Sequence, residues 1–537
     1  MVASKHPLIS KTGVDIMQKG GNAIDAAVAA AFVDCVVEPA MNGIGGEGIM
    51  AIHTADGEDA IIDYVGRPSK NCTPDMYDLL DELEPGWMGW RRVKDDANII
   101  GYKAATVPGT VAGLARALEL CGTMELKEVL EPAMRVAEEG FVIGWWTVSD
   151  IVGTIETFSR FPEWRRTFLK DGKYPPRAHG YDLRRNPDIL VNKDLARSLR
   201  LIMEEGPDAF YKGKIAEAIA KDMAQNGGAI TLEDLAMYEP IVLNPTPGTY
   251  RGYDVIYDPS HAGTTLIEIL NILEGFDLAG YRFGSFEYLH ILAEAICLAY
   301  ADRFEYMGDP GFAKVPQKGL ASKNYAEELR RRISFKRALA IQAGNPWPYK
   351  ECTTALTVVD EKRNAVAINQ TLVNAFGCGA VIHGTGIVLN NAMYGLNPEA
   401  GHANSIEGRK RRIQNVCPTL LLKDRELFMA LGAPGGRAIQ PSIAQTIVNM
   451  VDFGMDIQEA IEAPRITREV GEIQLDSRFS KEVCDRLTEI GHRVVRLDKE
   501  LGNWGRPVGI LVDSRKNLLY GGAECHFLGF ESEAIGY

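Results

Sequence analysis

Apolar positions follow two different periods along the chain, and these periods predict its helices and strands. An Ala-rich stretch at 13–37 has the spacing of an amphipathic helical region, broken at Gly20-Gly21, with Asn22 as the N-cap of its second helix. The same period predicts helices at 111–139, 194–205, 214–225, 264–273, 287–305 and 440–453. Runs rich in β-branched residues predict strands at 49–53, 353–360, 365–373 and 427–431. This alternation favours an α/β or α+β fold.

Two segments interrupt the pattern. Residues 160–193 are basic and contain prolines, which predicts a solvated region rich in loops. The run Gly-Asn-Pro-Trp-Pro-Tyr-Lys-Glu-Cys at 344–352 cannot continue a helix, because each proline lacks an N–H donor and restricts the residue before it. A predicted hairpin begins directly after this run, at Thr353.

Composition and charge exclude several classes of protein. The chain has 537 residues, of which 46% are hydrophobic and 24% charged, as is typical of a globular protein with a large core. Its net charge of −14 provides no field that would attract nucleic acid or an anionic membrane. The most apolar early stretch, 23–37, is too short to span a bilayer. The sequence as given starts without the pattern of an export signal, so we expect a cytoplasmic protein.

Familiar motifs for metals, cofactors and hydrolases give no match. The nine histidines include no H-x-x-x-H pair and the nine cysteines no C-x-x-C pair, so neither a zinc site nor a disulfide framework is predicted. The G-x-S-x-G elbow of the α/β-hydrolases does not occur. Residues 43–48 match G-x-G-x-x-G, but a strand follows them instead of preceding them, which argues against a dinucleotide site. We therefore expect no metal and no cofactor.

The pair Thr353-Thr354 is a candidate for nucleophilic chemistry. It stands at the start of a predicted strand, directly after the Pro-rich run. A threonine hydroxyl needs an adjacent base, and the α-amino group of an N-terminal threonine can serve as that base. Since an α-amine has a pKa of about 7.7–8.0, part of it is neutral at physiological pH and can accept the hydroxyl proton. Strand propensity alone also explains such a pair, so this interpretation needs a second element.

A glycine pair supplies that second element. The predicted strand at 427–431 ends in Gly432-Ala433-Pro434-Gly435-Gly436-Arg437, and a predicted helix follows. Glycines between a strand and a helix can present backbone N–H groups to an anionic oxygen. Gly435 and Gly436 are therefore candidates for an oxyanion hole, with a simple tight turn as the alternative.

At these positions and at many others the sequence closely resembles the γ-glutamyltranspeptidase family of N-terminal-nucleophile hydrolases. The matching motifs follow one another in family order at residues 6–8, 20–29, 43–46, 106–109, 227–231, 271–275, 308–310, 353–354, 386–391, 417–419 and 434–436. The resemblance implies an α+β fold, a four-layer αββα sandwich. It also implies autocatalytic cleavage between Cys352 and Thr353, after which fragments 1–352 and 353–537 stay folded together as one interwoven domain. In that scheme Thr353 is the nucleophile, Thr371 forms a hydrogen bond with it, and Gly435 and Gly436 form the oxyanion hole.

The sequence departs from the family pattern where transpeptidases bind the γ-glutamyl donor. The family's residues that hold the donor's α-amino and carboxylate groups are replaced at Val65, Val373, Ala392, Gly395, Gln414 and Asn415. A γ-glutamyl group would lose several charge-assisted hydrogen bonds, each worth roughly 1.5–3 kcal/mol. This argues against γ-glutamyl transfer.

Residues 41–48 and 63–68 look more like a divergent amidohydrolase branch that includes oxamate amidohydrolase. Within it, Arg67 could hold a substrate carboxylate as a planar fork, with a structural ion pair as the alternative. Gln414 and Asn415 complete the predicted substrate-binding residues. Ala355 stands where transpeptidases often have His, a sign that self-processing or pocket shape differs here.

The expected function is cofactor-free hydrolysis of a small amide that bears a carboxylate, through an ester of Thr353. Apart from this substrate, the expected partners are the two fragments of the chain itself. Two alternatives remain open. One is glutathione hydrolysis through contacts rebuilt at Gln414 and Asn415, and the other is a catalytically silent, uncut family member that acts as a binding protein.

Overall fold

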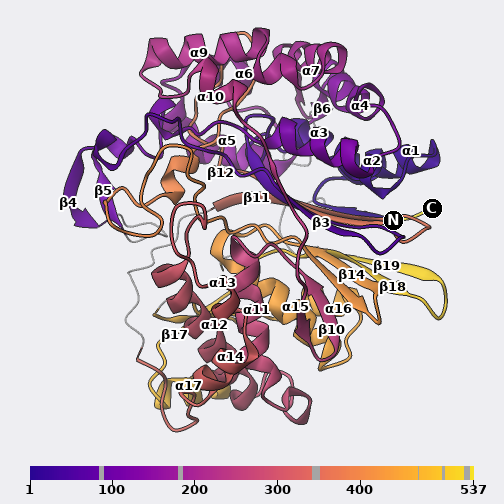
Figure 1. The fold of residues 1–537 in the computed structure, drawn as a ribbon, viewed down its shortest axis with the longest axis vertical. Helices are drawn as coiled ribbons and strands as arrows, with labels where there is room; N and C mark the ends of the chain where they lie inside the picture. The colour runs from indigo at the N-terminus through magenta and orange to yellow at the C-terminus, as the bar shows by residue number, and fades with distance from the viewer. Residues whose placement is uncertain are drawn as a thin grey trace.

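Two antiparallel β-sheets packed face to face form the centre of the molecule, and helices cover the outer face of each sheet (Figure 1). The computed structural model describes residues 1–83, 90–178, 186–340, 351–469, 471–498, 502, 504–524 and 532–537. The arrangement is the four-layer αββα sandwich that the resemblance implies. The run at 344–350, which the sequence predicted to be non-helical, lies outside the described residues.

The first sheet consists of seven strands in the described part of the chain. In spatial order these are β20 (Glu533–Ile535), β1 (Val2–Ser4), β11 (Glu351–Val359), β12 (Ala365–Asn374), β2 (Glu47–His53), β3 (Asp59–Asp63) and β8 (Ile241–Leu243). Strands that follow residue 352 in sequence thus alternate with strands that precede it. If the chain were cut at this point, both fragments would still contribute strands to one continuous sheet.

The second sheet has six described strands. In spatial order they are β19 (Leu518–Ala523), β18 (Val508–Asp513), β14 (Glu426–Gly432), β13 (Thr419–Lys423), β10 (Tyr253–Ile256) and β9 (Gly248–Tyr250). The smaller sheets are formed by β4 (Leu79–Leu83) with β5 (Arg91–Val93), by β6 (Phe141–Val142) with β7 (Ile189–Leu190), and by β15 (Ile466–Thr467), β16 (Ile473–Asp476) and β17 (Val494–Leu497).

The alternation of side chains along the strands divides the core into three layers. Ile49, Ala51 and Ala355 of the first sheet pack against residues of the second sheet such as Leu420 and Ile510. Their neighbours in sequence, which point to the opposite face of the first sheet, pack against the helices of the first helical layer. Each fully buried Val, Leu or Ile adds about 1.5–3 kcal/mol of hydrophobic stabilisation, so all three layers hold the sandwich together.

The two helical layers differ in their origin along the chain. The layer over the first sheet contains α1 (Pro7–Gln18), α2 (Ala23–Val37), α3 (Thr110–Cys121), α4 (Leu126–Glu139), α5 (Trp145–Phe158), α6 (Pro162–Phe168), α7 (Lys193–Glu205), α8 (Asp208–Tyr211), α9 (Lys214–Asn226) and α10 (Leu232–Ala236). The layer over the second sheet contains α11 (Ala262–Glu274), α12 (Phe286–Tyr306), α13 (Gln317–Leu320), α14 (Lys323–Arg330), α15 (Ile439–Val451), α16 (Ile457–Glu462) and α17 (Lys481–Glu489).

Most predicted elements are confirmed, and three predictions are wrong in part. The single helix predicted at 111–139 is two helices, because the Asp25 carboxylate accepts hydrogen bonds from Thr123 and Met124 in the turn between them. The segment at 160–193 is less loop-rich than predicted, since it contains α6. The predicted amphipathic helix after Asn22, α2, is buried on every side, between other helices and the first sheet.

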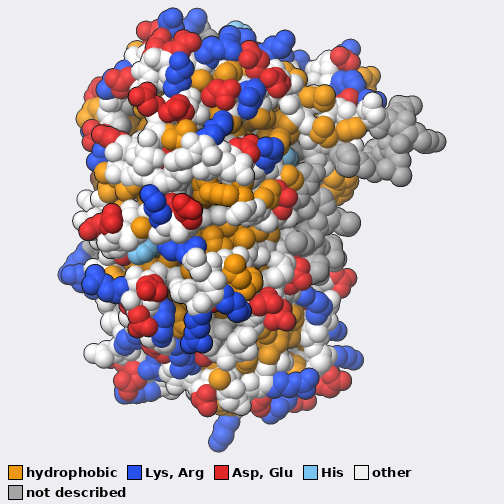
Figure 2. All heavy atoms as spheres, turned by 90° about the vertical axis from the view of Figure 1, so that its right-hand side faces the viewer, with side chains coloured by type: hydrophobic (Ala, Val, Ile, Leu, Met, Phe, Trp, Pro, Cys, Tyr) orange, Lys and Arg blue, Asp and Glu red, His pale blue; other side chains and the backbone are white. Residues whose placement is uncertain are grey.

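The surface carries mixed charges. Figure 2 shows side chains of both signs interspersed over the face that bears the ends of the sheets, with more uncharged surface across its middle. Within the described part of the chain, no helix has both the length and the apolar character required to cross a membrane.

Candidate active site

Thr353 lies at an irregularity near the start of β11, where the pairing with β12 shifts between Cys352 and Thr354. Its side chain is buried, and its Oγ1 donates a hydrogen bond of 3.4 Å to Thr371 Oγ1. Thr371 Oγ1 also accepts a hydrogen bond of 2.8 Å from the backbone N–H of Val373. The structure thus brings together two threonines that are 18 residues apart, in the contact that the family resemblance implies.

The strand register shows which way these hydroxyl groups face. Thr371 is paired with Glu47, and Asn369 is paired with Ile49, whose side chain lies in the core between the sheets. Paired residues in an antiparallel ladder share a face, and side chains alternate with a period of two. Thr371 and Glu47 therefore face the space between the two sheets, and so does the Thr353 hydroxyl group that contacts Thr371.

The predicted glycine pair comes from the second sheet. Gly435 and Gly436 connect β14 to α15 and have φ values of 133° and 59°, a region that favours glycine. A Cβ atom at Gly435 would lie 2.6 Å from the Cα atom of Gly505, so no side chain fits there. Backbone N–H groups at such a turn, near the N-terminus of a helix, can bind an oxyanion.

Asn369 joins this turn to the strand of Thr353. Its Nδ2 donates to the backbone oxygens of Thr354, at 3.2 Å, and Ala433, at 2.8 Å. One buried amide therefore bridges the first sheet and the turn after β14. Thr353, Thr371 and the glycine turn are thus linked through Asn369, and a nucleophile with backbone donors nearby can carry out acyl transfer to a hydroxyl group.

Glu47, a fully buried residue opposite Thr371, is the centre of a polar network that sequence reasoning missed. One oxygen of its carboxylate accepts from Gly66 N at 2.7 Å, and the other accepts from Arg412 Nε at 2.8 Å and from Gln414 Nε2 at 2.6 Å. The signals for it were an acidic residue in the glycine run 43–48 and the basic run 409–412 just before Gln414. Neither signal shows that the two segments meet.

The three predicted substrate-binding residues are placed differently from one another. Gln414 is buried and engaged by Glu47, while the Asn415 side chain accepts a hydrogen bond of 2.7 Å from Arg303. Arg67 donates to the backbone oxygen of Glu239 at 2.9 Å, and its guanidinium lies over the Tyr238 ring. Gln414 therefore lies closer to the threonine pair in the network than Arg67 does.

A second network supports the segment that carries Arg412 and Gln414. Arg411 forms ion pairs with Asp63 and Asp309, and His261 binds both Asp63 and the backbone N–H of Gln414. Burial acts to raise the pKa of Asp63, but His261 and Arg411 hold it well below its usual value. Asp63 is therefore ionised and holds His261 and Arg411 in position.

Another acid lies on the opposite face of β11. Asp34 of α2 is fully buried near Thr354 and accepts a hydrogen bond of 3.5 Å from Asn42. Burial and the nearby Glu38 raise the pKa of Asp34 well above its usual value, against the effect of Lys5. This carboxyl group lies in the helical layer, on the face of β11 opposite to the hydroxyl group of Thr353.

Within the described residues, one cluster has the donor types of a metal site. His290 Nδ1 and His492 Nε2 are 2.8 Å apart, and Glu294 Oε1 lies 3.6 Å from His492 Nε2. The Arg468 guanidinium, 2.9 Å from the other oxygen of Glu294, already balances the charge of that carboxylate. This buried cluster belongs to the layer over the second sheet, so it is separate from the threonine pair.

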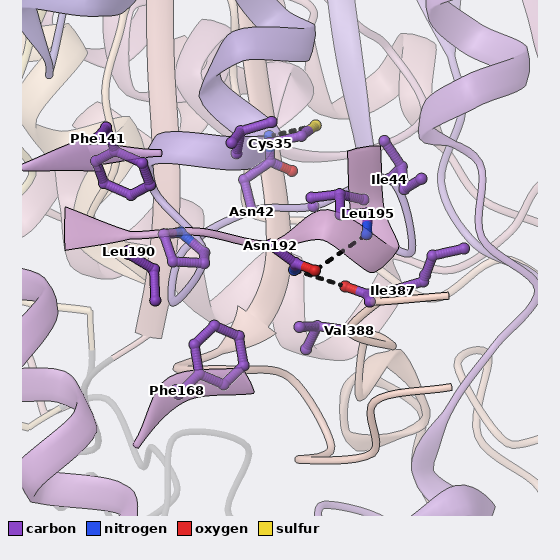
Figure 3. Close-up of a pocket in the computed structure, with 14 residues that line it drawn as sticks. Cys35, Asn42, Ile44, Phe141, Phe168, Leu190, Asn192, Leu195, Ile387 and Val388 are labelled. Atoms are coloured by element: carbon purple, nitrogen blue, oxygen red, sulfur yellow. Dashed lines mark hydrogen bonds between the residues drawn. The ribbon is translucent and has the colours of Figure 1, made fainter. Parts of the chain in front are cut away.

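A pocket in the helical layer over the first sheet is shown in Figure 3. It is a small cavity of about 20 Å³, lined mainly by apolar side chains, among them Phe141, Phe168 and Leu195. The Asn192 amide group crosses it to bind Leu195 N and Gly386 O, and the Asn42 amide group donates to Cys35. None of the residues discussed above as catalytic lines this pocket.

Known proteins match nearly the whole chain. The family model described as gamma-glutamyltranspeptidase matches residues 9–527. The acylase ACY 1 proenzyme of Pseudomonas sp. (strain SE83) is 41% identical over 504 residues, or 94% of this chain and 88% of that relative. The glutathione hydrolase proenzyme of Escherichia coli (strain K12) is 38% identical over 516 residues, or 92% of this chain and 85% of that relative.

Among solved structures, cephalosporin acylase from Bacillus halodurans is similar over the whole molecule. It superposes with a TM-score of 0.87 and 30% sequence identity, covering 100% of this chain and 96% of that chain. The family match, the sandwich fold and the sequence relatives all agree. The chain therefore belongs to the γ-glutamyltranspeptidase family.

Proposed function

We propose that the chain is an amide hydrolase that cuts itself between Cys352 and Thr353 and then uses Thr353 as its nucleophile. The observation that carries this proposal is the contact between Thr353 Oγ1 and Thr371 Oγ1, in the inter-sheet space next to the Gly435-Gly436 turn. Two of the relatives are named proenzymes, which supports activation by cleavage. The products of the cut would be fragments of 352 and 185 residues.

The proposed mechanism has two steps. Thr353 Oγ attacks the amide carbonyl while its own α-amine accepts the hydroxyl proton, and the Gly435 and Gly436 N–H groups bind the oxyanion. The C–N bond then breaks, the leaving amine takes that proton, and a threonyl ester remains. In the second step water attacks the ester with the α-amine again as base, which releases the acid and restores the hydroxyl group. Thr371 orients the Thr353 hydroxyl group throughout.

The proposed substrates are small amides that carry a carboxylate. The names acylase and glutathione hydrolase among the relatives support cleavage of an acyl–nitrogen bond. The replacements at Ala392 and Gly395 favour substrates without the α-ammonium group of a γ-glutamyl donor. The cationic side chain of Arg412, bound to Glu47 of the first sheet, is suited to an anionic substrate.

Thr353→Ala tests the proposal directly. We expect this variant to stay as one 59.0 kDa chain on a denaturing gel and to release no ammonia or amine from a panel of small amides. Thr353→Ser should still be cut. Thr357→Val is the matched control, because Thr357 lies on the same strand and is equally buried but plays no part in the scheme. Processing and hydrolysis that persist in Thr353→Ala would refute the role of this residue.

Two other outcomes distinguish the alternatives. Release of glutamate from glutathione at a rate comparable with the best small amide would favour glutathione hydrolysis, which the Escherichia coli relative's name supports. Wild-type protein that remains uncut, with no Thr353 N-terminus by mass spectrometry, would favour a silent binding protein.

A further inference from the structure

We propose that Arg412, held by Glu47, binds a carboxylate group of the substrate a few bonds away from the amide that Thr353 attacks. This inference rests on the proposed function, since it assigns the part of the same site that recognises charge. It identifies the substrate class as amides with a free carboxylate and names the residue that selects them.

Glu47 links Arg412 to the threonine pair. Glu47 is the direct cross-strand partner of Thr371, whose hydroxyl group contacts that of Thr353. Cβ atoms of such partners are about 4.5–5.5 Å apart, so Glu47 begins one side chain away from the threonine pair. Its carboxylate then accepts hydrogen bonds from Arg412 Nε at 2.8 Å and Nη2 at 2.5 Å.

The hydrogen bonds of Arg412 leave two of its N–H donors unused. Glu47 takes the edge formed by Nε and Nη2, and Nη1 donates to Ile413 O at 3.2 Å. A guanidinium has five N–H donors, so one on Nη1 and one on Nη2 have no acceptor among the described residues. A carboxylate that binds end-on across Nη1 and Nη2 would complete the set, in the bidentate geometry that arginine prefers.

The guanidinium is held rigidly, as a binding group should be. Gly395 packs against it so closely that a Cβ atom there would lie 2.4 Å from Arg412 Cδ and 2.7 Å from Nη1. The neighbouring Arg411 is anchored by Asp63 and Asp309. Because the Arg412 side chain is already ordered, binding of a substrate carboxylate costs little additional side-chain entropy.

The neighbouring arginine serves as a contrast. Arg411 has ion pairs with two carboxylates, so its charge is more than balanced within the protein. Arg412 has one, and that carboxylate is shared with Gln414 and Gly66. A buried guanidinium that is linked to the threonine pair through Glu47, with this single shared counter-ion, is suited to a second anion from the substrate.

The experiment compares substrates that differ only in charge. One pair is the 4-nitroanilide of succinic acid and its methyl ester, which places the carboxylate on the acyl side. The other pair is an N-acylated aminobenzoic acid and its methyl ester, which places it on the amine side. We expect the wild-type protein to prefer the charged member of one pair by about 10- to 100-fold in kcat/KM, as one charge-assisted hydrogen bond provides.

Variants of Arg412 distinguish a role in binding the substrate carboxylate from a role in supporting the fold. Arg412→Gln should lose this preference, mainly through a higher KM for the charged substrate, and should lower kcat/KM for the neutral ester less than for its charged partner, whereas Arg412→Lys should keep part of the preference. Arg409→Gln, an exposed arginine in the same basic run, is the matched control and should behave as wild type. Because Arg412→Gln leaves Glu47 buried without its counter-ion, the double variant Glu47→Gln/Arg412→Gln provides a second test that creates no lone charge.

Two results would overturn the inference alone: a wild-type protein that prefers neither charged substrate, or variants that lose charged and neutral substrates equally. Hydrolysis that survives Thr353→Ala would instead overturn the proposed function and, with it, the role of Arg412. The two failures are thus seen in different measurements, charge preference in one case and dependence on Thr353 in the other.

Discussion

At the scale of single residues, the contact between two hydroxyl groups is the feature on which the proposed catalysis depends. Thr371 Oγ1 accepts from Val373 N and from Thr353 Oγ1, so it fixes one orientation of the Thr353 hydroxyl group. Thr371→Val keeps the shape of the side chain but removes that acceptor. We expect kcat to fall by about 10-fold, the value of the one orienting hydrogen bond that is lost.

Thr371→Ser provides the control for that prediction, because it restores the oxygen atom and should recover most of the rate. Comparison of single-turnover ester formation in the two variants measures the effect. If Thr371→Val and Thr371→Ser lose equal activity, packing of the Thr371 methyl group, and not its oxygen, is what matters.

The backbone conformation of Val373 cannot be predicted from the pattern of residues. In the sequence it looks like an ordinary strand residue, and the strand prediction at 365–373 is confirmed. In the structure its φ is 83°, a value that β-branched residues avoid, and it faces the irregularity of β11 at Cys352. Strain of this kind is found next to functional sites. Nothing in the local sequence of Val373 predicts this backbone conformation.

At the scale of elements, the turn between β14 and α15 tolerates little change in backbone conformation or side-chain size. Gly435 has a φ of 133° and its missing Cβ leaves room for the backbone at Trp504 and Gly505. Gly435→Ala should therefore shift the turn, remove the oxyanion donors from their place and lower kcat by about 100-fold or more. Activity assays together with the melting temperature measure both effects.

Gly454→Ala is the matched control for the turn. Gly454 also has a positive φ, 67°, but a Cβ atom there would have no atom within 4 Å of it, so the substitution strains the backbone without a clash. It should lower the melting temperature slightly and leave kcat unchanged. Equal losses of activity in both glycine variants would indicate a general stability effect and would argue against an oxyanion role for the turn.

The elements also show how far sequence reasoning reaches. Periodicity located α7, α9, α11, α12 and the β11–β12 hairpin within about two residues, because their apolar faces follow the core directly. The hypothesis that Thr353 is the nucleophile came from its place after the Pro-rich run together with the glycine pair and the family resemblance, and the resemblance alone pointed to Thr371. Glu47 and Arg412 were missed, because 365 residues separate them and only the fold brings a strand residue and a loop residue together.

At the scale of the whole molecule, the strand order keeps the two proposed fragments together. In the first sheet, β11 and β12 lie between β1 and β2, so the segments before and after residue 352 form one hydrogen-bonded sheet. The buried cluster of His290, Glu294 and His492 makes a second connection, since its histidines come from the two segments. The stability of the two segments together thus depends on side chains that gain or lose protons as the pH changes.

The titration of this histidine cluster predicts the response to acid. Burial lowers the pKa of His290 to about 4 and that of His492 to about 3, and the Arg468 charge acts in the same direction. An unfolded histidine has a pKa near 6.5, so between about pH 6.5 and 4 the unfolded chain binds protons that the folded protein excludes. The stabilising contribution is complete above pH 6.5 and is lost as the pH falls. His6, with a pKa lowered to about 4 by burial, adds to the same window.

We therefore expect the melting temperature of wild-type protein to fall between pH 6.5 and 4.5, and to fall less steeply in His492→Gln. Each excluded proton contributes about 1.4 kcal/mol per pH unit to the slope of stability, so the loss of one titrating group is measurable by calorimetry. His383→Gln is the control, because the His383 side chain is 81% exposed. If the two variants show the same pH dependence, the cluster does not determine acid stability. If His492→Gln alone flattens the curve, the junction between the two segments is the acid-sensitive part of the molecule.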